Sequence, residues 1–587
     1  MHNFKVWGPR ASNMRLKLND QVLQMDGPDD RGWWTLHVEE AECGMDYAYL
    51  LDDDPTPYPD PRSLSQPRGV HGLSRLYDHS LFAWTDARWQ PPPLAGAIIY
   101  ELHIGTFSAE GTFDGAIAHL DHLCDLGITH IELMPIAEFA GDRGWGYDGV
   151  ALFAVAEPYG GAEALKRFVN ACHAKGLSVI LDVVYNHFGP VGNYTSKFGP
   201  YLTQKHSTPW GDAVNFDEGG SDQVRRFFCD NAEMWLQDYH IDGLRLDAVH
   251  EFIDRAAVKF MEQLSAEVEQ LSATLGKKLV LIAESDLNDP RVVRPREAGG
   301  YGMDAQWSDD FHHSLFTMIY GKEPGRGYYD DFGTMDDLVE SLKRVFVYDG
   351  IFSGYRQHVH GRPVEGLSAH HFLGYIQNHD QVGNRGLGER LEHLVGLDAA
   401  KVALGVVLMA PFIPMLFMGE EFASSSPFLY FADHEDEEMA KAVSEGRKRD
   451  FALFGFAELE IPNPEARETF DRSKLRWDEV HTGHHEEMFA WTKALIHLRR
   501  TTVALNDGDL GHLRIESNSD QRWFIMKRGS VRIFINLGDQ EIPFTLLKDE
   551  TLRLCSRPEL APQDNTLRLP PMTLAVLLSP KANRFGQ

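Results

Sequence analysis

The sequence predicts an α/β protein whose centre is a (β/α)8 (TIM) barrel, with one β-sandwich domain before it and another after it. From residue 97 onward, short apolar runs alternate with amphipathic helical stretches, and eight such runs follow one another. Eight strands separated by helices favour a closed barrel over a doubly wound sheet, which has fewer strands and usually carries a glycine-rich phosphate loop. Both ends of the chain show the short alternating runs of antiparallel strands. The predicted domains are therefore 1–96, 97–505 and 506–587.

Composition agrees with an ordinary globular protein of several domains. The 587 residues exceed what one hydrophobic core fills, which suggests about three domains. The chain is 43% hydrophobic and 24% charged, and its formal net charge is −31. That charge disfavours nucleic acid and an anionic membrane as partners, whereas a neutral small-molecule substrate is compatible with it.

Three features of the sequence bear on location, and together they predict the cytoplasm. The five cysteines are scattered, odd in number and without a CxxC spacing, which predicts free thiols in a reducing compartment. The opening residues MHNFKVWGPR hold no apolar signal core. The apolar stretch 402–418 is short for a membrane span and contains Pro411 and Pro414. We expect it to form the end of a buried helix, a turn and a buried strand.

The elements of the flanking domains can be placed from their turn signals. The first domain is expected to hold the strands KVWGP, RLKLN, GWWTLHVEE and DYAYLLDDD. The proline-rich PPPLAG at 91–96 is the expected boundary with the barrel. In the last domain, QRWFIMKRGSVRIFINLG reads as two alternating strands joined by a turn.

The barrel elements follow in order. The eight strands are expected at 97–104, 128–135, 178–186, 243–249, 279–285, 304–309, 371–379 and 413–421. A glycine- and aromatic-rich excursion, 187–221, follows the third strand, and loops of this length are usually functional. A helix over 485–503 is expected to close the barrel.

The stretch GLRLDAVH, residues 243–250, places two charges among core residues. Side chains alternate between the faces of a strand, so Arg245 and Asp247 point the same way. Because a lone buried charge is costly, the pair forms either a salt bridge on a half-exposed sheet or a catalytic carboxylate held beside a guanidinium. This stretch alone leaves both interpretations open.

Polar side chains also end several of the other predicted barrel strands. A barrel enzyme places its active site at the carboxyl ends of its strands. The residues found there are Glu101, His103, Asp182, Asn186, His187, Arg245, Asp247, His250, Glu284, Asn378, His379 and Asp380. Such residues on five strands are hard to explain by packing, which favours an active site.

Three carboxylates on separate strands fit the cleavage of a glycosidic bond. One carboxylate attacks, one donates a proton, and a third holds the sugar. A cation bound by residues such as Asp182, His187 and Asp247 is the alternative, but no HExxH or paired Cys/His spacing supports it. No elbow motif supports a Ser or Cys nucleophile. We therefore expect no metal and no cofactor.

Four short stretches resemble the shared regions of the α-amylase-type glycoside hydrolases. They are DVVYNH (182–187), GLRLDAVH (243–250), IAES (282–285) and QNHDQVGN (377–384). Their order and strand placement match as well, and the resemblance covers the predicted barrel. It implies a retaining double displacement in which Asp247 is the nucleophile, Glu284 the general acid/base, and Asp380 the carboxylate that grips sugar hydroxyls.

The same resemblance implies supporting roles. Arg245 would orient Asp247 and keep it ionised, because an opposite charge lowers the pKa of a carboxyl group. The pKa of Glu284 is expected to be raised when Asp247 is ionised, since two nearby carboxylates disfavour double ionisation. The residues expected to bind the sugar at the cleavage point are His187, His379, Tyr147 and His250. Asp182 is expected to brace Arg245.

Within this family the resemblance extends to one subgroup. An amino-terminal β-domain followed by YELHIGTF resembles the branching enzymes, the debranching enzymes and the maltooligosyltrehalose trehalohydrolases. Four further stretches, DPRSLSQPRGVHG, QWSDDFHHSLF, QNHDQVGNRGLGERL and GEEFASSSPFLYFADHEDEEMAKAVSEGRK, resemble the trehalohydrolases. This implies an oligosaccharide substrate, maltooligosyltrehalose, whose α-1,4 bond next to the terminal trehalose unit is hydrolysed. Asp309, Asp310 and Gln381 are the candidates for binding the leaving trehalose.

Two alternatives remain open. A branching or α-1,6 debranching enzyme would share the three carboxylates, so the catalytic motifs do not exclude one. A non-catalytic glycan-binding protein belongs to a different class, and the intact set of carboxylates argues against it. Among the aromatic residues, Trp33 and Trp34 are expected in the core of the first domain, whereas Trp210 and Tyr194 fit a sugar platform and loop packing equally well.

Overall fold

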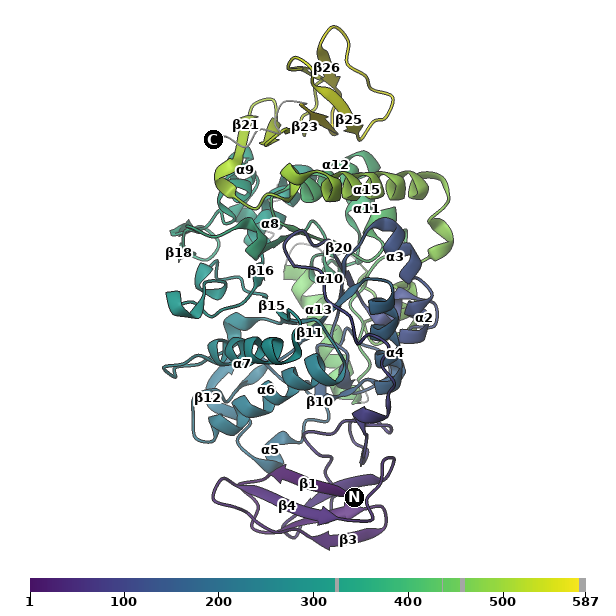
Figure 1. The fold of residues 1–587 in the computed structure, drawn as a ribbon, viewed down its shortest axis with the longest axis vertical. Coiled ribbons are helices and arrows are strands. Elements are labelled where there is room, and N and C mark those ends of the chain that lie inside the picture. The colour runs from purple at the N-terminus through teal and green to yellow at the C-terminus, as the bar shows by residue number, and fades with distance from the viewer. Residues whose placement is uncertain (322–326, 435, 454–459, 580–587) are drawn as a thin grey trace.

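The computed structural model describes residues 1–321, 327–434, 436–453 and 460–579. Figure 1 shows three parts stacked along the longest axis, with the amino-terminal strands at the bottom, the barrel in the middle and the carboxyl-terminal strands at the top. The barrel is a closed ring of eight parallel strands in sequence order. The predicted fold class is confirmed in both the barrel and the flanking antiparallel sheets.

All eight predicted barrel strands are present. They are β7 (Ile99–Leu102), β8 (His130–Leu133), β11 (Ser178–Val183), β14 (Gly243–Leu246), β15 (Val280–Ala283), β16 (Ala305–Trp307), β19 (Phe372–Gly374) and β20 (Ile413–Phe417). Side chains alternate between the two faces of each strand, and the two faces contribute to two separate hydrophobic cores. In β11, Ile180 belongs to the cluster that fills the barrel, whereas Val179 and Leu181 belong to the larger core outside it.

Helices cover the outside of the barrel. The longer ones are α4 (Gly161–Ala174), α6 (Ser221–Asp238), α7 (Phe260–Leu275), α8 (Asp309–Tyr320), α12 (Leu397–Met409) and α15 (Gly483–Thr501). The apolar stretch 402–418 is the end of α12, a turn and β20, as expected. No helix in the described ranges combines the length and apolar character that a membrane span needs.

The amino-terminal part consists of two antiparallel sheets. One pairs β1 (His2–Trp7) with β4 (Trp33–Val38), and the other joins β2 (Met14–Leu18), β3 (Gln21–Gln24), β5 (Asp46–Leu51) and β6 (Ser74–Arg75). The polar strand QVLQ of β3 was not expected from the sequence. Trp34 is 2% exposed in this core. Trp33 instead donates from Nε1 to Oε1 of Gln223 on α6 at 3.0 Å, which joins this part to the barrel.

The carboxyl-terminal part also has two sheets. The larger sheet consists of five strands, in the order β21 (Leu513–Asn518), β22 (Trp523–Arg528), β23 (Val531–Asn536), β27 (Thr573–Leu578) and β25 (Thr551–Cys555). The smaller sheet pairs β24 (Ile542–Thr545) with β26 (Thr566–Leu569). Buried Arg528 joins this part to the barrel by donating to the carbonyls of Met409 and Ala410 at the end of α12. We propose that the domain boundaries lie at 96/97, between β6 and β7, and at 505/506, before β21.

The excursion over 187–221 contains regular structure that its sequence did not indicate. A short helix, α5 (Thr195–Phe198), precedes an antiparallel hairpin of β12 (Leu202–Thr208) and β13 (Gly211–Val214). Figure 1 places β12 at the lower side of the barrel, close to α6. The excursion therefore presents a structured hairpin rather than an irregular loop.

A buried aspartate fixes the connector before the barrel to the amino-terminal end of β14. Asp242 is 2% exposed. It accepts hydrogen bonds from Nε1 of Trp89 at 2.8 Å, Nε2 of His173 at 3.1 Å, Oγ of Ser178 at 3.0 Å and the N–H of Val179 at 2.9 Å. Four donors from three segments thus converge on one carboxylate.

Asp242→Ala should therefore destabilise the protein without disturbing the opposite end of the barrel. Removing one partner from a buried charged network typically costs about 3–5 kcal/mol, because the remaining donors stay buried without an acceptor. Thermal unfolding should show a Tm several degrees lower than that of the unchanged protein. Asp539→Ala, at an exposed turn, is the matched control and should leave the Tm unchanged; an equal Tm for both variants would contradict the proposed anchor.

Candidate active site

The polar residues predicted at the ends of the strands converge on one face of the barrel. Asp182 of β11 and Arg245 of β14 are direct register partners in neighbouring parallel strands. Glu284 follows β15, and Asp380 lies in α10 (His379–Gly383), shortly after β19. Because parallel strands end at the same edge of a barrel, these side chains meet in one place.

The guanidinium of Arg245 is the centre of this arrangement. It is 0% exposed. Its Nη1 donates to Oδ2 of Asp182 at 2.7 Å and to Oδ1 of Asp247 at 2.9 Å, and Nη2 forms an ion pair with Oε2 of Glu284 at 2.9 Å. Its central carbon lies 4.0 Å from the ring centroid of Trp307 on β16. One buried cation therefore serves three carboxylates and rests on an aromatic face, a contact that the sequence did not reveal.

Asp247 and Glu284 lie beside this one cation and share their protonation. Burial and the charge of Glu284 raise the pKa of Asp247 well above its usual range. Burial also works to raise the pKa of Glu284, but Arg245 and the N–H of Ala248 outweigh it and hold that pKa below its ordinary value. The sequence led us to expect a lowered pKa for Asp247 beside Arg245 and a raised pKa for Glu284, and both directions are reversed. The difference arises because Glu284 faces both Arg245 and the N–H of Ala248, whereas burial and the charge of Glu284 outweigh Arg245 at Asp247.

The backbone after β14 aims a donor at Glu284. Ala248 has φ 40° and ψ 53°, the left-handed region that residues other than glycine and asparagine seldom adopt. Its N–H donates to Oε2 of Glu284 at 2.8 Å, and the N–H of Val249 donates to the Glu284 carbonyl at 3.0 Å. Strain of this kind is typical of active sites, and here it fixes the position of one carboxylate.

Tyr147 and His379 form a stacked pair above Asp182. Their ring centroids are 5.1 Å apart and the planes are 24° from parallel. The Tyr147 hydroxyl donates to Oδ2 of Asp182 at 2.6 Å and lies 2.8 Å from Nε2 of His379. The same nitrogen is 3.5 Å from Oδ2 of Asp380, whose side chain is 39% exposed. Asp380 is thus the open member of this group.

His187 lies at the rim, where the β12–β13 hairpin reaches the site. Its ring stacks on Trp210, with centroids 4.7 Å apart and planes only 7° from parallel. Burial lowers the pKa of His187 to about 4, so the imidazole is neutral. Trp210 is 48% exposed, which brings an accessible indole beside a site histidine. Tyr194, by contrast, pairs its hydroxyl with Nδ1 of His71 at 2.6 Å and packs its ring against Tyr58, both in the segment before the barrel.

A cavity of about 220 Å³ borders Asp380. Its lining includes Asp286, Asp309, Asp310, Tyr328, Arg356 and Gln381. The three predicted candidates for the leaving sugar therefore line one cavity. His250, the last predicted site residue, places Nε2 4.0 Å from Oδ1 of Asp286 at the edge of this cavity.

The three candidates differ in how they are held. Oδ2 of Asp310 accepts from Nδ2 of Asn288 at 3.0 Å and from the N–H groups of Val347 and Tyr348 at 2.8 and 3.0 Å. Asp310 therefore braces the cavity wall. Asp309 accepts from the hydroxyl of Tyr375 at 2.5 Å, and burial raises its pKa to about 7.

Gln381 is held from two sides. Its side-chain Oε1 accepts a hydrogen bond from the hydroxyl of Tyr329 at 2.8 Å. Its backbone N–H donates to Oδ1 of Asn378 at 2.8 Å. Because Tyr329 holds the side-chain oxygen of Gln381, the orientation of the whole side-chain amide, including its nitrogen, is fixed.

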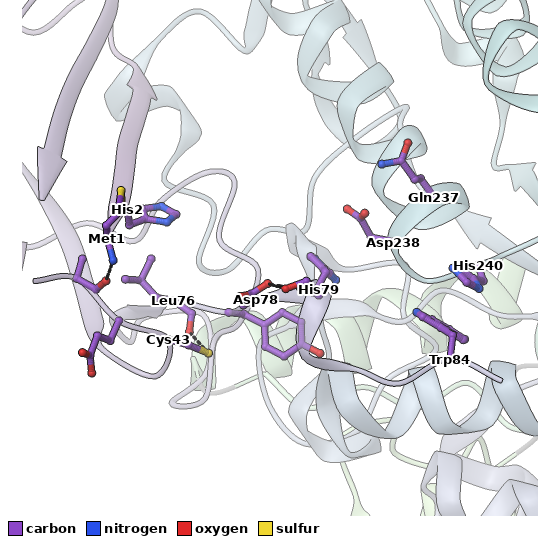
Figure 2. Close-up of a pocket in the computed structure, with 14 residues that line it drawn as sticks. Met1, His2, Cys43, Leu76, Asp78, His79, Trp84, Gln237, Asp238 and His240 are labelled. Atoms are coloured by element: carbon purple, nitrogen blue, oxygen red, sulfur yellow. Dashed lines mark hydrogen bonds between the residues drawn. The ribbon is translucent and has the colours of Figure 1, made fainter. Parts of the chain in front are cut away.

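A second pocket, of about 810 Å³, lies elsewhere on the molecule. Figure 2 shows it between Met1 and His2 of the first strand and Gln237, Asp238 and His240 near the end of α6. His240 precedes β14, whereas Asp247 follows it, so this pocket lies at the opposite end of the barrel from the carboxylates. It contains none of the predicted site residues and is separate from the candidate active site.

Within the described residues, one cluster has the composition of a metal site, and it lies outside the carboxylate group. The ligand atoms of His206, Asp217 and Glu218 are within 4.8 Å of one another in the excursion. Glu218 is already paired with Lys205, so a cation there would compete with an ammonium group.

Comparisons with known proteins bear on this geometry. Residues 68–208 match the family model "Alpha amylase, catalytic domain". A Rhizobium sp. (strain M-11) protein named malto-oligosyltrehalose trehalohydrolase is 45% identical over 98% of this chain and 97% of its own length. A protein of the same name from Saccharolobus solfataricus is 45% identical over 85% of both chains. The crystal structure of a putative alpha amylase from Salmonella typhimurium superposes with a TM-score of 0.90 at 34% identity, covering 98% of this chain and 97% of that one. With its four strand-end motifs on an eight-stranded barrel, the chain belongs to the malto-oligosyltrehalose trehalohydrolases, within the α-amylase family of glycoside hydrolases.

Proposed function

We propose that this chain hydrolyses the α-1,4-glucosidic bond next to the terminal trehalose unit of a maltooligosyltrehalose and releases trehalose. The observation that carries the chemistry is the single guanidinium of Arg245, which holds Asp247 and Glu284 at its two nitrogens. A retaining glycosidase needs two neighbouring carboxyl groups, one as nucleophile and one as acid. The 45% identity to a protein of that name supports the substrate.

The reaction proceeds in two displacements. Asp247 attacks the anomeric carbon while Glu284 gives its proton to the glycosidic oxygen, so that trehalose leaves and a glycosyl ester forms. Glu284 then takes a proton from water, which attacks the same carbon and frees Asp247. The attack requires the state in which Glu284 carries a proton and Asp247 is ionised.

The residues around the pair have separate tasks on the cleaved sugar. Asp380, His379 and His187 hydrogen-bond its hydroxyl groups, and Tyr147 lies beneath it, held by Asp182. Trp210 offers its exposed face to the next glucose unit, because it stacks on His187 at the rim. Stacking of this kind suits a sugar, whose carbon–hydrogen bonds form an apolar face.

The cavity beyond Asp380 is the proposed position of the leaving trehalose. Asp309 and Gln381 offer polar groups to it, while Asp310 holds the wall and His250 its edge. A 1,1 linkage turns the final glucose away from the direction of a 1,4 linkage. Hydrogen-bonding groups arranged for the 1,1-linked disaccharide are left unpaired by a 1,4-linked one. Such a cavity therefore favours trehalose over maltose as the leaving group.

We further propose that the protein works in the cytoplasm on this oligosaccharide, with no nucleic acid or membrane partner. All five cysteines are free, which fits a reducing compartment. The net charge of −31 repels anionic polymers and surfaces but is indifferent to a neutral sugar.

Asp247→Asn should abolish turnover while leaving the fold intact. The two side chains are nearly isosteric, but an amide cannot form the glycosyl ester. We expect kcat to fall by about 10⁴-fold or more, as it does when other enzymes lose a covalent nucleophile. Steady-state kinetics on a trehalose-capped maltooligosaccharide measures this. A kcat within tenfold of the unchanged enzyme would remove Asp247 from this role.

Glu284→Gln should stop cleavage of sugar leaving groups and spare activated ones at the first step. An aryl leaving group needs little protonation, so its departure depends less on a general acid. The measurement compares the pre-steady-state release of an aryl group with the release of trehalose. Equal losses for both substrates, with the first step limiting in each, would count against Glu284 as the acid.

The third expectation concerns specificity. A trehalose-capped maltooligosaccharide should be cleaved at least about a hundredfold faster, by kcat/KM, than a maltooligosaccharide of equal length, because two or three unpaired buried groups cost about 1–3 kcal/mol each. Asp309→Ala and Gln381→Ala should reduce that preference by removing polar groups that line the cavity. Asp310→Ala should reduce it indirectly, because Asp310 holds the backbone of Val347 and Tyr348 in the cavity wall. Exposed Glu365→Ala is the control.

Equal rates on both substrates in the unchanged enzyme would leave a general α-glucan hydrolase. Branched products from glycogen would instead favour the branching alternative. A preference that survives all three changes would retain the function and discard these residues as its source.

A further inference from the structure

A buried carboxylate on the first barrel strand holds His379 with both of its oxygens. Oε1 of Glu101 lies 2.5 Å from Nδ1 of His379, and Oε2 accepts the backbone N–H of the same residue at 2.9 Å. Each of the two residues is 1% exposed. Glu101 therefore fixes the orientation of the ring and places a negative charge against it in a site shielded from water.

The charges around His379 decide its protonation. Burial works to lower its pKa, but the carboxylates of Asp380 and Glu101 outweigh it and raise the pKa to about 10, against the opposing charge of Arg245. The Tyr147 hydroxyl lies 2.8 Å from Nε2, and the charges of Asp182, Glu284 and Glu132 also act on the ring. An imidazolium has two N–H donors, so Nδ1 is committed to Glu101 and Nε2 faces the site.

A second buried glutamate lies beside Glu101. Glu132 of β8 is the register partner of Glu101 on β7. Burial and the charge of Glu101 raise the pKa of Glu132 well above its usual range, and in the described part of the chain neither of its oxygens has a hydrogen-bond partner. Two carboxyl groups therefore lie on neighbouring strands, and Glu101 is the one bonded to His379.

We propose that Glu101 is a positioning residue that keeps His379 as an imidazolium, and that this cation in turn favours the ionised form of Asp380. The role of ionised Asp380 in gripping sugar hydroxyls rests on the proposed function, whereas the charge on His379 does not. His379 lies between the two carboxylates, 2.5 Å from one and 3.5 Å from the other, so a single proton serves both. Burial and Glu284 raise the pKa of Asp380, and His379 is the strongest influence that opposes the rise.

Glu101→Gln and Glu132→Gln form a matched pair of variants. Both replace a buried glutamate on neighbouring strands by its neutral isostere, but only the first changes a carboxylate bonded to His379. At pH 7 we expect Glu101→Gln to lose about 10- to 100-fold in kcat/KM, the usual cost of removing a group that supports a site residue. Glu132→Gln should stay within about threefold. Equal losses in the two variants would overturn the proposal.

A direct measurement of His379 separates this proposal from the proposed function. In protein labelled with ¹⁵N-histidine, the His379 signals are assigned by their absence in His379→Gln. They should show an imidazolium through pH 8 in the unchanged protein and in Glu132→Gln, and titrate at least one pH unit lower in Glu101→Gln. A neutral ring at pH 7 in the unchanged protein would overturn the proposal, whatever sugar the enzyme cleaves.

Two further variants test for a merely structural role. Glu101→Asp keeps the charge and should preserve the imidazolium signals, even where its shorter side chain reduces activity. Adding Glu101→Gln to His379→Gln should cost no more than a few-fold, because the first change acts through the second residue. A full additional loss in that background would show that Glu101 acts on another part of the site and overturn the proposal.

Discussion

The fully buried guanidinium of Arg245 is the interaction on which the candidate site depends. Three carboxylates taken out of water would repel one another, and a single planar cation with two nitrogens facing them opposes this repulsion. The cation is held in turn by Asp182 from below and by the Trp307 ring. A lysine could supply charge at one point but not the two-sided geometry that joins Asp247 to Glu284.

The barrel makes this arrangement possible because its strands are parallel and of similar length. Side chains two residues apart on β14 point to the same place, and the neighbouring strands deliver their last residues to the same edge. Outside the strands, the protein uses strained or added pieces. A left-handed Ala248 aims an N–H at Glu284, and a hairpin inserted after β11 brings Trp210 against His187. The rigid frame thus places the charges, while loops shape the space around them.

The sequence was sufficient to predict the barrel, because each strand is an apolar run bounded by turn residues. It also predicted the three carboxylates as candidate site residues, since charged side chains at the ends of apolar strands are costly to bury unless they serve a function. It did not indicate β12, because LTQKHST is polar and its strand pairing depends on the neighbouring segment. Nor could it show Trp307 beneath Arg245 or Glu101 against His379, because these contacts join strands that become neighbours or face each other only when the barrel closes.

The balance of charge in the site has a consequence for what else can bind there. Negative side chains outnumber the cations around the cleavage point, since Arg245 faces three carboxylates and His379 is matched by Glu101. This excess is suited to a sugar that becomes positively charged for an instant. It is equally suited to a molecule that is positive all the time. Sugar-shaped amines should therefore occupy the site far more tightly than neutral sugars of the same shape, and amine buffers carrying hydroxyl groups should compete with substrate.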